Sequence, residues 1–461
     1  MAETNRVVVI GGGISGLACA HRLKRQGTDV MLLESSDQAG GLIGTVQQNG
    51  FLFERGPQSF QGTPALLDLV RELGIESELL RANPSAPRYV LRGGRLRKVP
   101  LSPQALVGSS LLGLGSRWKI VSEPFRRTSA PGHEESVAEF VRRKFGHEIL
   151  EYLVSPFVSG VYAGDPEQLS LRAAFPTLEE WERQFGSVLR GAMKSRPARE
   201  ERKKAPPLCA FRQGMSTLTD ALARDLSTSL RTGVRVKQLS KVDGGAPRFE
   251  IHLVENGRNA VVDATAVVLA TPAYVSAHLV ASMSPQLAQL LSGIPYAPVA
   301  TVAAGYYSKQ FKAPPDGFGF LIPRKEKMRT LGTVWNSSLF PGRAPDGCVL
   351  MTSFLGGATD PDLVHKADTE ITAIANSENQ RTLEIIGEPI ATATWKYEKA
   401  LPQYNLGHGH IVERVREATA QLPGIFFSGN YLEGPAIGKC LEQATRTADR
   451  VRERAVSLAG R

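Results

Sequence analysis

Apolar runs and a helical pattern alternate over the first 34 residues. Residues 7–10 (VVVI) predict a short buried strand, and residues 14–25 carry apolar side chains at helical spacing, among them Leu17 and Leu23. Residues 29–34 (DVMLLE) predict the next strand. Such a strand–turn–helix–strand unit is typical of the start of a doubly wound α/β sheet.

A second set of patterns occupies the middle of the chain. Residues 215–226 predict an amphipathic helix. Strand patterns follow over residues 235–242, 249–264 and 267–272. Asn256-Gly257 favours a hairpin turn within the second of these segments. The third begins with apolar residues and predicts a buried strand that returns to the first sheet.

The remaining patterns predict a second sheet and a return to the first. Residues 295–400 contain several strand patterns that predict an antiparallel sheet in a second domain. Residues 424–455 repeat the order strand, glycine-rich turn and long helix, with Pro435 suited to the first helical position. A dinucleotide-binding half at each end of the chain makes the first domain discontinuous. A first domain that is completed by the C-terminal segment favours a flavin over NAD, because the N-terminus of the C-terminal helix can stabilise negative charge on a reduced flavin ring.

The turn after the first strand reads GGGISG (11–16), a GxGxxG motif in its expected context. Gly11 allows the tight turn, Gly13 lets the backbone approach a pyrophosphate, and Gly16 lets the helix pack on the strand. The helix N-terminus then receives the phosphates. Glu34 ends the second strand, where its carboxylate can accept hydrogen bonds from ribose hydroxyls and would repel a 2′-phosphate. The motif therefore predicts a dinucleotide other than NADP.

Positive charge is concentrated in one part of the chain. The net charge is +10, and residues 81–204 hold 22 Lys and Arg against 13 Asp and Glu. The basic runs have no interleaved aromatic residues and no nucleic-acid motif, which disfavours nucleic-acid binding. Beside the apolar segment 105–115 they favour an anionic membrane surface or an acidic substrate, and a solvated basic face without a ligand stays open. The runs are RGGRLRK (92–98), FRR (125–127), RRK (142–144) and KSRPAREERKK (194–204).

Other sequence features narrow the class of protein. The four cysteines are far apart: Cys19, Cys209, Cys348 and Cys440. They predict neither a disulfide framework nor a zinc ribbon, and a reducing compartment suits them. No secretory signal and no run of 18 apolar residues is evident, so we expect a cytoplasmic protein that is soluble or peripheral on the inner face of the membrane. His408 and His410 could bind a metal from a strand, but no nearby Cys or acidic cluster completes such a site.

Longer motifs point to a known family. VIGGGISG (9–16), E-x5-G-G (34–41) and GNYLEGPAIGKC (429–440) together resemble the flavin-containing amine oxidase superfamily. More local stretches resemble its protoporphyrinogen oxidase family, which includes bacterial coproporphyrinogen-oxidising members, and this resemblance runs nearly end to end. These stretches are FERGPQSF (53–60), PRYVLRGG (87–94), GVYAGDPEQLS (160–170), DGFGFLIP (316–323) and LPQYNLGHG (401–409).

The resemblance implies an α/β fold with three parts. A discontinuous Rossmann-like FAD-binding domain would comprise residues 1–70, 207–270 and 405–461. A mixed-sheet substrate-binding domain would comprise 71–88 and 271–404. A mainly helical, basic region over 89–206 would associate with the membrane.

The resemblance also implies a set of residues that hold non-covalent FAD. Val236 corresponds to a residue whose backbone meets the adenine, and the segment 435–437 to backbone against the flavin ring. Tyr397 sits where bacterial relatives often carry tryptophan beside the flavin, with Trp395 as a competing candidate. The full set is Gly11, Gly12, Gly13, Ile14, Ser15, Gly16, Glu34, Ser35, Gly41, Leu42, Gly56, Pro57, Gln58, Ser59, Val236, Tyr397, Gly429, Pro435, Ala436 and Ile437.

For the substrate, the resemblance implies one charged anchor and an apolar pocket. Arg88 corresponds to an arginine that meets a propionate of the tetrapyrrole, a task that suits a planar guanidinium. One more surface arginine in a basic segment is the alternative. The apolar walls would be Gly160, Phe318, Gly319, Leu321, Val334 and Phe354, each of which could equally be plain core.

Two positions depart from the family pattern. Gln38 stands where the superfamily commonly has an arginine, so one cation near the pyrophosphate is missing. Pro435 replaces a small aliphatic residue and removes one N–H donor near the flavin. Both changes bear on cofactor affinity.

The implied reaction is the oxygen-dependent, six-electron oxidation of protoporphyrinogen IX to protoporphyrin IX, with hydrogen peroxide as by-product. Flavin would supply the reactive centre, so no catalytic side chain is singled out. Oxidation of coproporphyrinogen III is the first alternative, and oxidation of amines or carotenoids the second. A non-enzymatic carrier is the third, although the glycine motifs at both ends are intact. A homodimer stays open.

Overall fold

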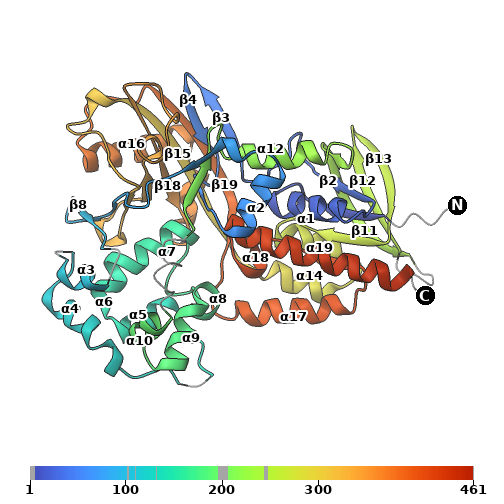
Figure 1. The fold of residues 1–461 in the computed structure, drawn as a ribbon, viewed down its shortest axis with the longest axis horizontal. Coiled ribbons are helices and arrows are strands. Elements are labelled where there is room, and N and C mark those ends of the chain that lie inside the picture. Colours follow the sequence, from blue (N-terminus) through green and yellow to red (C-terminus); the bar gives the residue numbers. More distant parts are fainter. Residues whose placement is uncertain are drawn as a thin grey trace.

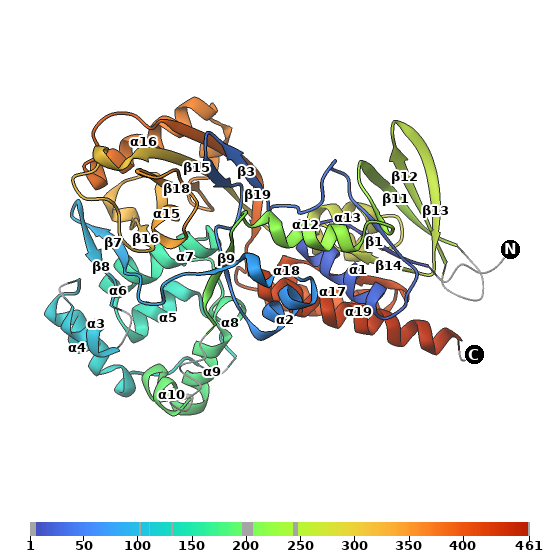
Figure 2. The same cartoon turned by 45° about the horizontal axis from the view of Figure 1, so that its top comes forward.

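The computed structural model describes residues 6–100, 103–109, 111–130, 132–195, 206–242 and 248–459. Most of the basic run 194–204 lies outside these residues. A sheet-and-helix body holds both chain ends, and a large sheet and a cluster of helices lie together beside it (Figures 1 and 2).

A parallel sheet of five strands forms the centre of the first body, in the order β10-β2-β1-β14-β20. Its strands are β1 (Val7–Ile10), β2 (Val30–Leu33), β10 (Leu230–Arg231), β14 (Ala266–Leu269) and β20 (Ile425–Phe427). The predicted return of the middle and C-terminal segments to the first sheet is therefore confirmed. Because β1 and β14 are buried throughout, both faces of the sheet must be covered.

Helices from distant parts of the chain cover one face. Apolar side chains of this face pack with α1 (Ile14–Arg25), α2 (Pro64–Glu72), α12 (Ser216–Asp225) and α19 (Ile437–Ala459). α1 and α19 run side by side (Figure 1). The other face carries α13 (Ala273–Val280), α14 (Pro285–Ser292), α17 (His408–Ala420) and the sheet of β11 (Val234–Val242), β12 (Arg248–Glu255) and β13 (Arg258–Ala264). Asn256 and Gly257 turn with positive φ between β12 and β13, as predicted.

A sheet of seven strands, in the order β19-β15-β18-β17-β16-β7-β8, forms the second part. Its pairs are antiparallel except for β16 with β7, so the sheet is mixed. α16 (Asp368–Leu383) covers one of its faces. The strands are β7 (Arg88–Arg92), β8 (Arg95–Lys98), β15 (Tyr296–Tyr307), β16 (Gly319–Leu321), β17 (Thr330–Val334), β18 (Cys348–Gly356) and β19 (Ala391–Pro402).

Short helices form the third part. They are α3 (Pro103–Gly108), α4 (Leu114–Val121), the 3₁₀ turn η2 (Glu123–Phe125), α5 (Val137–Lys144), α6 (His147–Ile149), the π turn η3 (Leu150–Val154), α7 (Ser155–Tyr162), α8 (Leu171–Ala174), α9 (Pro176–Phe185) and α10 (Val188–Lys194). The predicted helical range 89–206 thus starts with the strands β7 and β8, and helices begin at Pro103. No helix among the described residues is long and apolar enough to cross a bilayer.

A buried network of charges holds these helices together. Lys144 and Glu123 are both fully buried, with Nζ 3.3 Å from Glu123 Oε1 and 2.8 Å from Glu182 Oε1. Glu123 also accepts N–H bonds from Val188 and Leu189 at the start of α10. Because an unpaired buried charge is costly, these contacts fix η2 against α5, α9 and α10.

The small elements between the bodies are hairpins and short sheets. β3 (Thr45–Gln48) and β4 (Phe51–Glu54) form a hairpin, while β9 (Leu208–Phe211) lies between β5 (Phe60–Gln61) and β6 (Leu79–Arg81). Further short turns are α15 (Asn336–Leu339), α18 (Asn430–Glu433), η1 (Glu76–Glu78), η4 (Ser308–Gln310), η5 (Arg324–Glu326) and η6 (Pro361–His365). The ring of Phe51 packs over Gly305 of β15, so the hairpin rests on the large sheet.

A buried ion pair joins this hairpin to the two bodies. Arg343 Nη1 lies 3.5 Å from Glu54 Oε1, and both side chains are 1% exposed. Arg343 also donates to the Phe211 carbonyl at 3.0 Å, and Glu54 accepts from Thr45 Oγ1 and the Met215 N–H. Burial raises the pKa of Glu54 to about 7, although Arg343 and the two hydrogen bonds act to lower it.

This pair makes a pH-dependent prediction for Arg343→Met. The variant leaves Glu54 buried without its cation, which costs about 3–5 kcal/mol when the carboxylate is ionised. With Arg343 present the folded pKa of Glu54 is about 7, already above that of an exposed carboxyl, and loss of the cation raises this pKa further. Folded Glu54 is therefore protonated at pH 5.5 in both proteins, and the cost of the change grows as the pH rises above about 7, where the wild type stabilises the carboxylate and the variant does not. We expect the drop in melting temperature, read by circular dichroism, to be smaller at pH 5.5 than at pH 8. Lys312→Met, at an exposed pair, is the control, and an equal drop at both pH values would contradict the prediction.

Candidate functional site

The turn between β1 and α1 has no room for side chains except at one point. A Cβ at Gly16 would lie 1.8 Å from the Gly11 carbonyl oxygen, and one at Gly12 would lie 2.9 Å from Glu34. At Gly13 nothing lies within 4 Å of such an atom. Gly13 precedes the first turn of α1, whose N–H groups have no partner within the helix. The open space at Gly13 therefore suits an anionic group.

Glu34 holds this turn in place. Its Oε2 accepts the Gly12 N–H at 2.6 Å, and its Oε1 accepts the Ser36 N–H at 2.7 Å and the Ser35 hydroxyl at 3.2 Å. The carboxylate is buried, and its remaining lone pairs are the ones that could accept from ribose hydroxyls. The predicted ribose contact of Glu34 and Ser35 stays a prediction, but the structure adds a role that the spacing alone did not reveal.

The adenosine end of the predicted site contains a hollow. Val234 N donates to the Glu34 carbonyl, so β11 starts beside this residue, and Val236 lies two residues on. An open hollow of about 330 Å³ lies here, lined by Ser35, Gly233, Arg235, Lys237, Val254, Asn256 and Gly257. Its place next to Glu34 fits the adenine position expected for Val236.

Two further loops approach the glycine turn. A Cβ at Gly41 would lie 3.2 Å from Gly13 Cα, and Gly40 N donates to the Gly12 carbonyl at 2.8 Å. A Cβ at Gly56 would lie 2.1 Å from the carbonyl oxygen of Leu42, whose side chain is exposed. The loops around Gly41 and Gly56 are therefore in backbone contact, and their predicted place at the cofactor stays a prediction.

Gln58 ties the second loop to the large sheet. Its Nε2 donates to the Gly56 carbonyl at 2.8 Å, and its Oε1 accepts from Asn336 Nδ2 at 2.6 Å. Asn336 Oδ1 in turn accepts from the Thr352 hydroxyl at 2.9 Å. All three side chains are buried. Gln58 thus positions the Gly56–Ser59 loop, including the half-buried Pro57, in addition to any contact it makes with the cofactor.

The C-terminal turn brings a helix end to the same region. Ala436 O accepts the Cys440 N–H, and α19 begins at Ile437. Pro435 therefore lies ahead of the helix, so its predicted place at the first helical position is wrong. Gly429, earlier in this turn, has no room for a side chain, because a Cβ there would lie 2.6 Å from Tyr431 Cε1. The N-termini of α1 and α19 come together, since Cys440 contacts the Ser15 side chain.

These features fit the expected FAD. The open space at Gly13 suits the pyrophosphate, the buried carboxylate of Glu34 suits a ribose, and the N-terminus of α19 meets the loops where a flavin would lie. The residues come from both chain ends and the middle, so only the assembled fold presents them together.

Strand register brings the predicted substrate residues onto one face of the large sheet. Directly opposite residues point the same way. Arg88 lies opposite Gly319, Gly319 opposite Val334, and Leu321 opposite Gly332. Along the sheet the pairs Gly332 with Phe354, Phe354 with Thr301, and Thr301 with Trp395 continue the same face. α16 covers the opposite face, so this one is turned toward the cofactor loops.

Not every residue of this group is an exposed wall. Gly319 has a φ of 138°, and a Cβ there would lie 2.1 Å from the Thr333 carbonyl oxygen, so close strand packing explains this glycine. Phe318, Leu321, Val334 and Phe354 are each partly exposed, as walls of a pocket must be. The pocket assignment of these residues stays a prediction.

α7 closes over this face at Gly160. A Cβ at Gly160 would lie 2.5 Å from Leu321 Cδ2, so the helix touches the sheet there. Phe157 and Val161, which the sequence interpretation missed, are 45% and 46% exposed and share a side of α7 with Gly160. Their spacing of three and one residues from Gly160 is the signal that could have found them.

Arg88 is free to bind an anion. Its guanidinium lies over the ring of Phe318 at 5.1 Å from the centroid. The side chain is exposed, and among the described residues no carboxylate lies within 4.0 Å of it. Arg92, on the same strand, is by contrast paired with Glu148 at 2.8 Å.

The structure separates the two candidates for the aromatic residue beside the flavin. Tyr397 donates its hydroxyl to the Arg55 carbonyl at 3.1 Å, one residue before Gly56. Trp395 instead packs with the cluster around Phe51 and Phe53. Tyr397 therefore lies nearer to the cofactor loops.

Other chemistry-bearing groups fall outside this site. His408 and His410 lie on the first turn of α17 and not on a strand, and His408 is buried while His410 is exposed, so they cannot chelate one ion together. Burial lowers the pKa of His408 to about 4. Within the described part of the chain no group of three or more His, Cys, Asp and Glu side chains could hold a metal.

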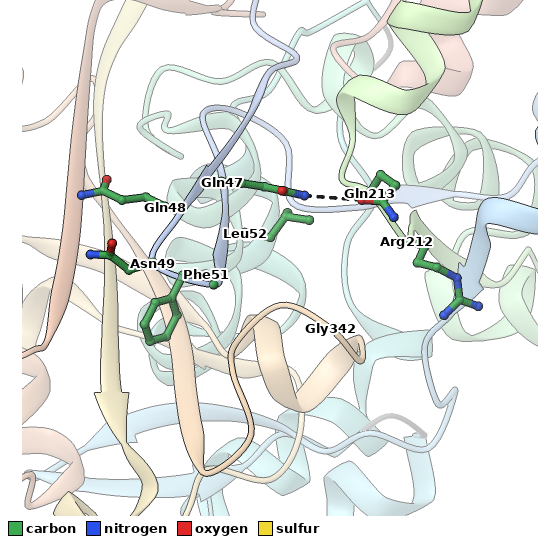
Figure 3. A pocket seen from close by; sticks show the side chains of 9 residues that line it. Gln47, Gln48, Asn49, Phe51, Leu52, Arg212, Gln213 and Gly342 are labelled. Carbon is green, nitrogen blue, oxygen red and sulfur yellow. Dashed lines mark hydrogen bonds between the residues drawn. The ribbon is translucent and has the colours of Figure 1, made fainter.

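A second hollow is a polar one at the tip of the β3–β4 hairpin, away from the glycine loops. It has a volume of about 500 Å³ and is open to solvent. Figure 3 shows amide side chains around it, with Gln47 and Gln213 joined at 3.4 Å. An open hollow lined mainly by polar side chains does not suit an apolar substrate. Its lining residues are Gln47, Gln48, Asn49, Gly50, Phe51, Leu52, Arg212, Gln213 and Gly342.

Comparison with known proteins agrees with this geometry. Residues 14–452 match the model of the family described as flavin containing amine oxidoreductase. A chloroplastic protoporphyrinogen oxidase of Nicotiana tabacum is 34% identical over 96% of this chain and 85% of its own length. A coproporphyrinogen III oxidase of Bacillus subtilis is 30% identical over 95% of this chain and 96% of its own length. A crystal structure from Exiguobacterium sp. 255-15, provisionally described as a protoporphyrinogen oxidase, superposes with a TM-score of 0.82 at 24% identity, over 97% of this chain and 99% of that one.

Proposed function

This chain belongs to the flavin-containing amine oxidoreductase family and is an FAD-dependent oxidoreductase, and on that premise we propose that it oxidises protoporphyrinogen IX to protoporphyrin IX, with coproporphyrinogen III as the alternative substrate. The observation that carries the proposal is the partly apolar sheet face beside the FAD loops, with the unpaired Arg88 at its edge. The plant and Bacillus relatives are both named for porphyrinogen oxidation.

The residues of this face would bind and orient the tetrapyrrole. Leu321, Val334 and Phe354 offer an apolar wall to the ring system, and Phe157 and Val161 of α7 offer a second wall. Arg88 would grip one propionate bidentately, which fixes the ring in its plane. The ring methylene nearest the cofactor would then be the position that reacts.

FAD, when bound, supplies a two-electron acceptor that molecular oxygen can reoxidise. The protein's part is to hold the loops at Gly41 and Gly56 against each other and, through Gln58, against the sheet. Three two-electron rounds remove six hydrogens from the substrate, and three molecules of oxygen become three of hydrogen peroxide. Tautomerisation between rounds would let one fixed methylene position serve each time.

Amine oxidation on the same scaffold is the weaker candidate. It usually needs aromatic side chains that frame the amine at the flavin. Tyr431, the aromatic of the C-terminal turn, is fully buried and packs with the core around Tyr296. The Tyr431 side chain therefore cannot contact a substrate.

Anaerobic mixing of the yellow holoenzyme with each porphyrinogen tests the function. Bleaching of the flavin absorbance near its visible maximum is expected with protoporphyrinogen IX or coproporphyrinogen III, followed by recovery and porphyrin fluorescence when oxygen is admitted. The faster substrate identifies the preference. Bleaching by a primary amine but by neither porphyrinogen would contradict the proposal.

Arg88→Ala tests the propionate anchor. Loss of one charge-assisted contact should raise the substrate concentration for half-maximal flavin reduction by about tenfold or more. Lys98→Ala removes an exposed cation of the neighbouring strand that lies opposite Tyr89 and so points to the other face of the sheet, and it should change this concentration by less than about twofold. Unchanged affinity with rapid reduction in the Arg88 variant would remove Arg88 from the site.

We also propose that the helical part contacts an anionic membrane surface. Leu114, Trp118 and Val121 are 80%, 70% and 51% exposed and recur at the spacing of one side of α4. Phe125, in the turn η2 that follows, is 86% exposed. Arg190 lies over the ring of Phe125 at 5.8 Å. Apolar side chains flanked by cations suit an interface with anionic lipid. The membrane would also take up the apolar substrate and product.

Vesicle flotation tests this surface. The double change Trp118→Ser and Phe125→Ser should lower binding to vesicles that contain phosphatidylserine by about tenfold or more. Ile386→Ser alters an equally exposed apolar residue, 78% exposed, in the loop between α16 and β19, and is the matched control. Equal binding by the double variant and the wild type would remove this side of the molecule from the interface.

A further inference from the structure

Gln38 is uncharged and stands at a position of the cofactor loops where a positively charged side chain is expected. The side chain is exposed in the bend after β2, and the superfamily commonly carries arginine at this point. FAD brings two negative phosphates to the open space at Gly13. The amides of α1 carry only partial charge, so a full positive charge elsewhere would compensate.

The neighbouring loop carries such a charge at Arg55. The backbone N–H of Arg55 donates to the Gly44 carbonyl at 2.8 Å, three residues beyond Gly41. Gly56 contacts the Leu42 backbone on the other side. Both contacts place the Arg55 backbone along the loop that begins at Gly41, next to Gly13.

The guanidinium follows the same loop. A Cβ at Gly44 would lie 3.0 Å from Arg55 Cδ and 3.5 Å from both Nε and Nη1, so the side chain lies flat along this glycine. Any side chain at 44 would displace it. The loop sequence therefore leaves room for an arginine that reaches across from the adjoining strand end.

Arg55 has no protein carboxylate to neutralise it. It is exposed, and among the described residues its guanidinium has no acidic partner within 4.0 Å, unlike the neighbouring buried pair of Arg343 with Glu54. Its charge does reach the Tyr397 hydroxyl: burial raises the pKa of Tyr397, while Arg55 acts to lower it. The guanidinium hydrogen-bonds this neutral hydroxyl but has no carboxylate partner, so its charge is available to an anion beside the cofactor loop.

We propose that Arg55 supplies the positive charge for the FAD pyrophosphate that Gln38 cannot supply. This inference rests on FAD as the cofactor and not on the identity of the substrate, so its test needs no porphyrinogen. The alternative partner for the same charge is the reduced flavin ring, which becomes negative only on reduction.

Serial dilution of the holoenzyme tests the assignment through the fluorescence of released FAD. Arg55→Gln should raise the Kd of oxidised FAD by about tenfold to a hundredfold, because one charge-assisted contact is lost. Arg55→Lys should lose less, since it keeps the charge but not the fork of donors. Arg212→Gln changes an exposed-loop arginine beside the hairpin hollow and should leave the Kd within about twofold (Figure 3).

The midpoint potential of the bound flavin separates the two anionic partners. The pyrophosphate carries the same charge in both redox states, so the potential of Arg55→Gln should equal that of the wild type. A more negative potential with an unchanged Kd would assign Arg55 to the ring and overturn the proposal. An unchanged Kd alone would also overturn it.

A rescue variant shows whether the raised Kd of Arg55→Gln comes from the lost charge or from a disturbed structure. Gln38→Arg combined with Arg55→Gln returns a guanidinium from the other loop and should recover the Kd to within about threefold of wild type. Thermal melting of both variants should match the wild-type apoprotein, because Arg55 is exposed. Failure of the rescue would show that the loss came from something other than charge, and would overturn the proposal.

Discussion

The cofactor end of the molecule depends on backbone contacts that leave no room for a Cβ at several glycines. Helix α1 lies so close to β1 that a Cβ at Gly16 would meet the Gly11 carbonyl, and a Cβ at Gly56 would meet the Leu42 carbonyl in the same way. Among the three glycines between β1 and α1, Gly13 is the one with open space around it. Four separate segments are thereby forced to converge on a single small volume.

Polar contacts then tie this centre to the large sheet. The chain from Gln58 through Asn336 to Thr352 runs from a cofactor loop to the sheet face that carries Phe354 two residues on. The buried pair of Glu54 and Arg343 holds the strand that leads into the same loop. Leaving any of these buried polar or charged groups without its partner would cost free energy of folding. The two sets of contacts therefore fix the distance between the cofactor loops and the pocket wall.

Local patterns predicted the local structure well. Helix α1 spans the predicted residues and the Asn256–Gly257 hairpin forms as expected, because the period of apolar residues and the turn chemistry act over short distances. The buried strand predicted over 267–272 forms as well, but it ends at Leu269. The register of the large sheet could not be read from the sequence, since it depends on pairings between strands far apart. The same holds for Phe157 and Val161, whose exposure becomes visible only once α7 rests on Leu321. The place of Pro435 was misjudged because Gly434 and Pro435 extend the turn before α19 starts.

The order of strands in the five-stranded sheet has a consequence for synthesis of the protein. β20 and α19 come about 400 residues after α1 in the sequence, yet α19 packs along α1. A nascent chain therefore cannot complete the cofactor site until α19 has been synthesised, even though domains tend to fold from the N-terminus onward. Chains that stop before β20 would expose apolar surface of α1 and β14 and would lack the helix end at the FAD site. Cofactor retention can thus distinguish chains that include α19 from chains that do not.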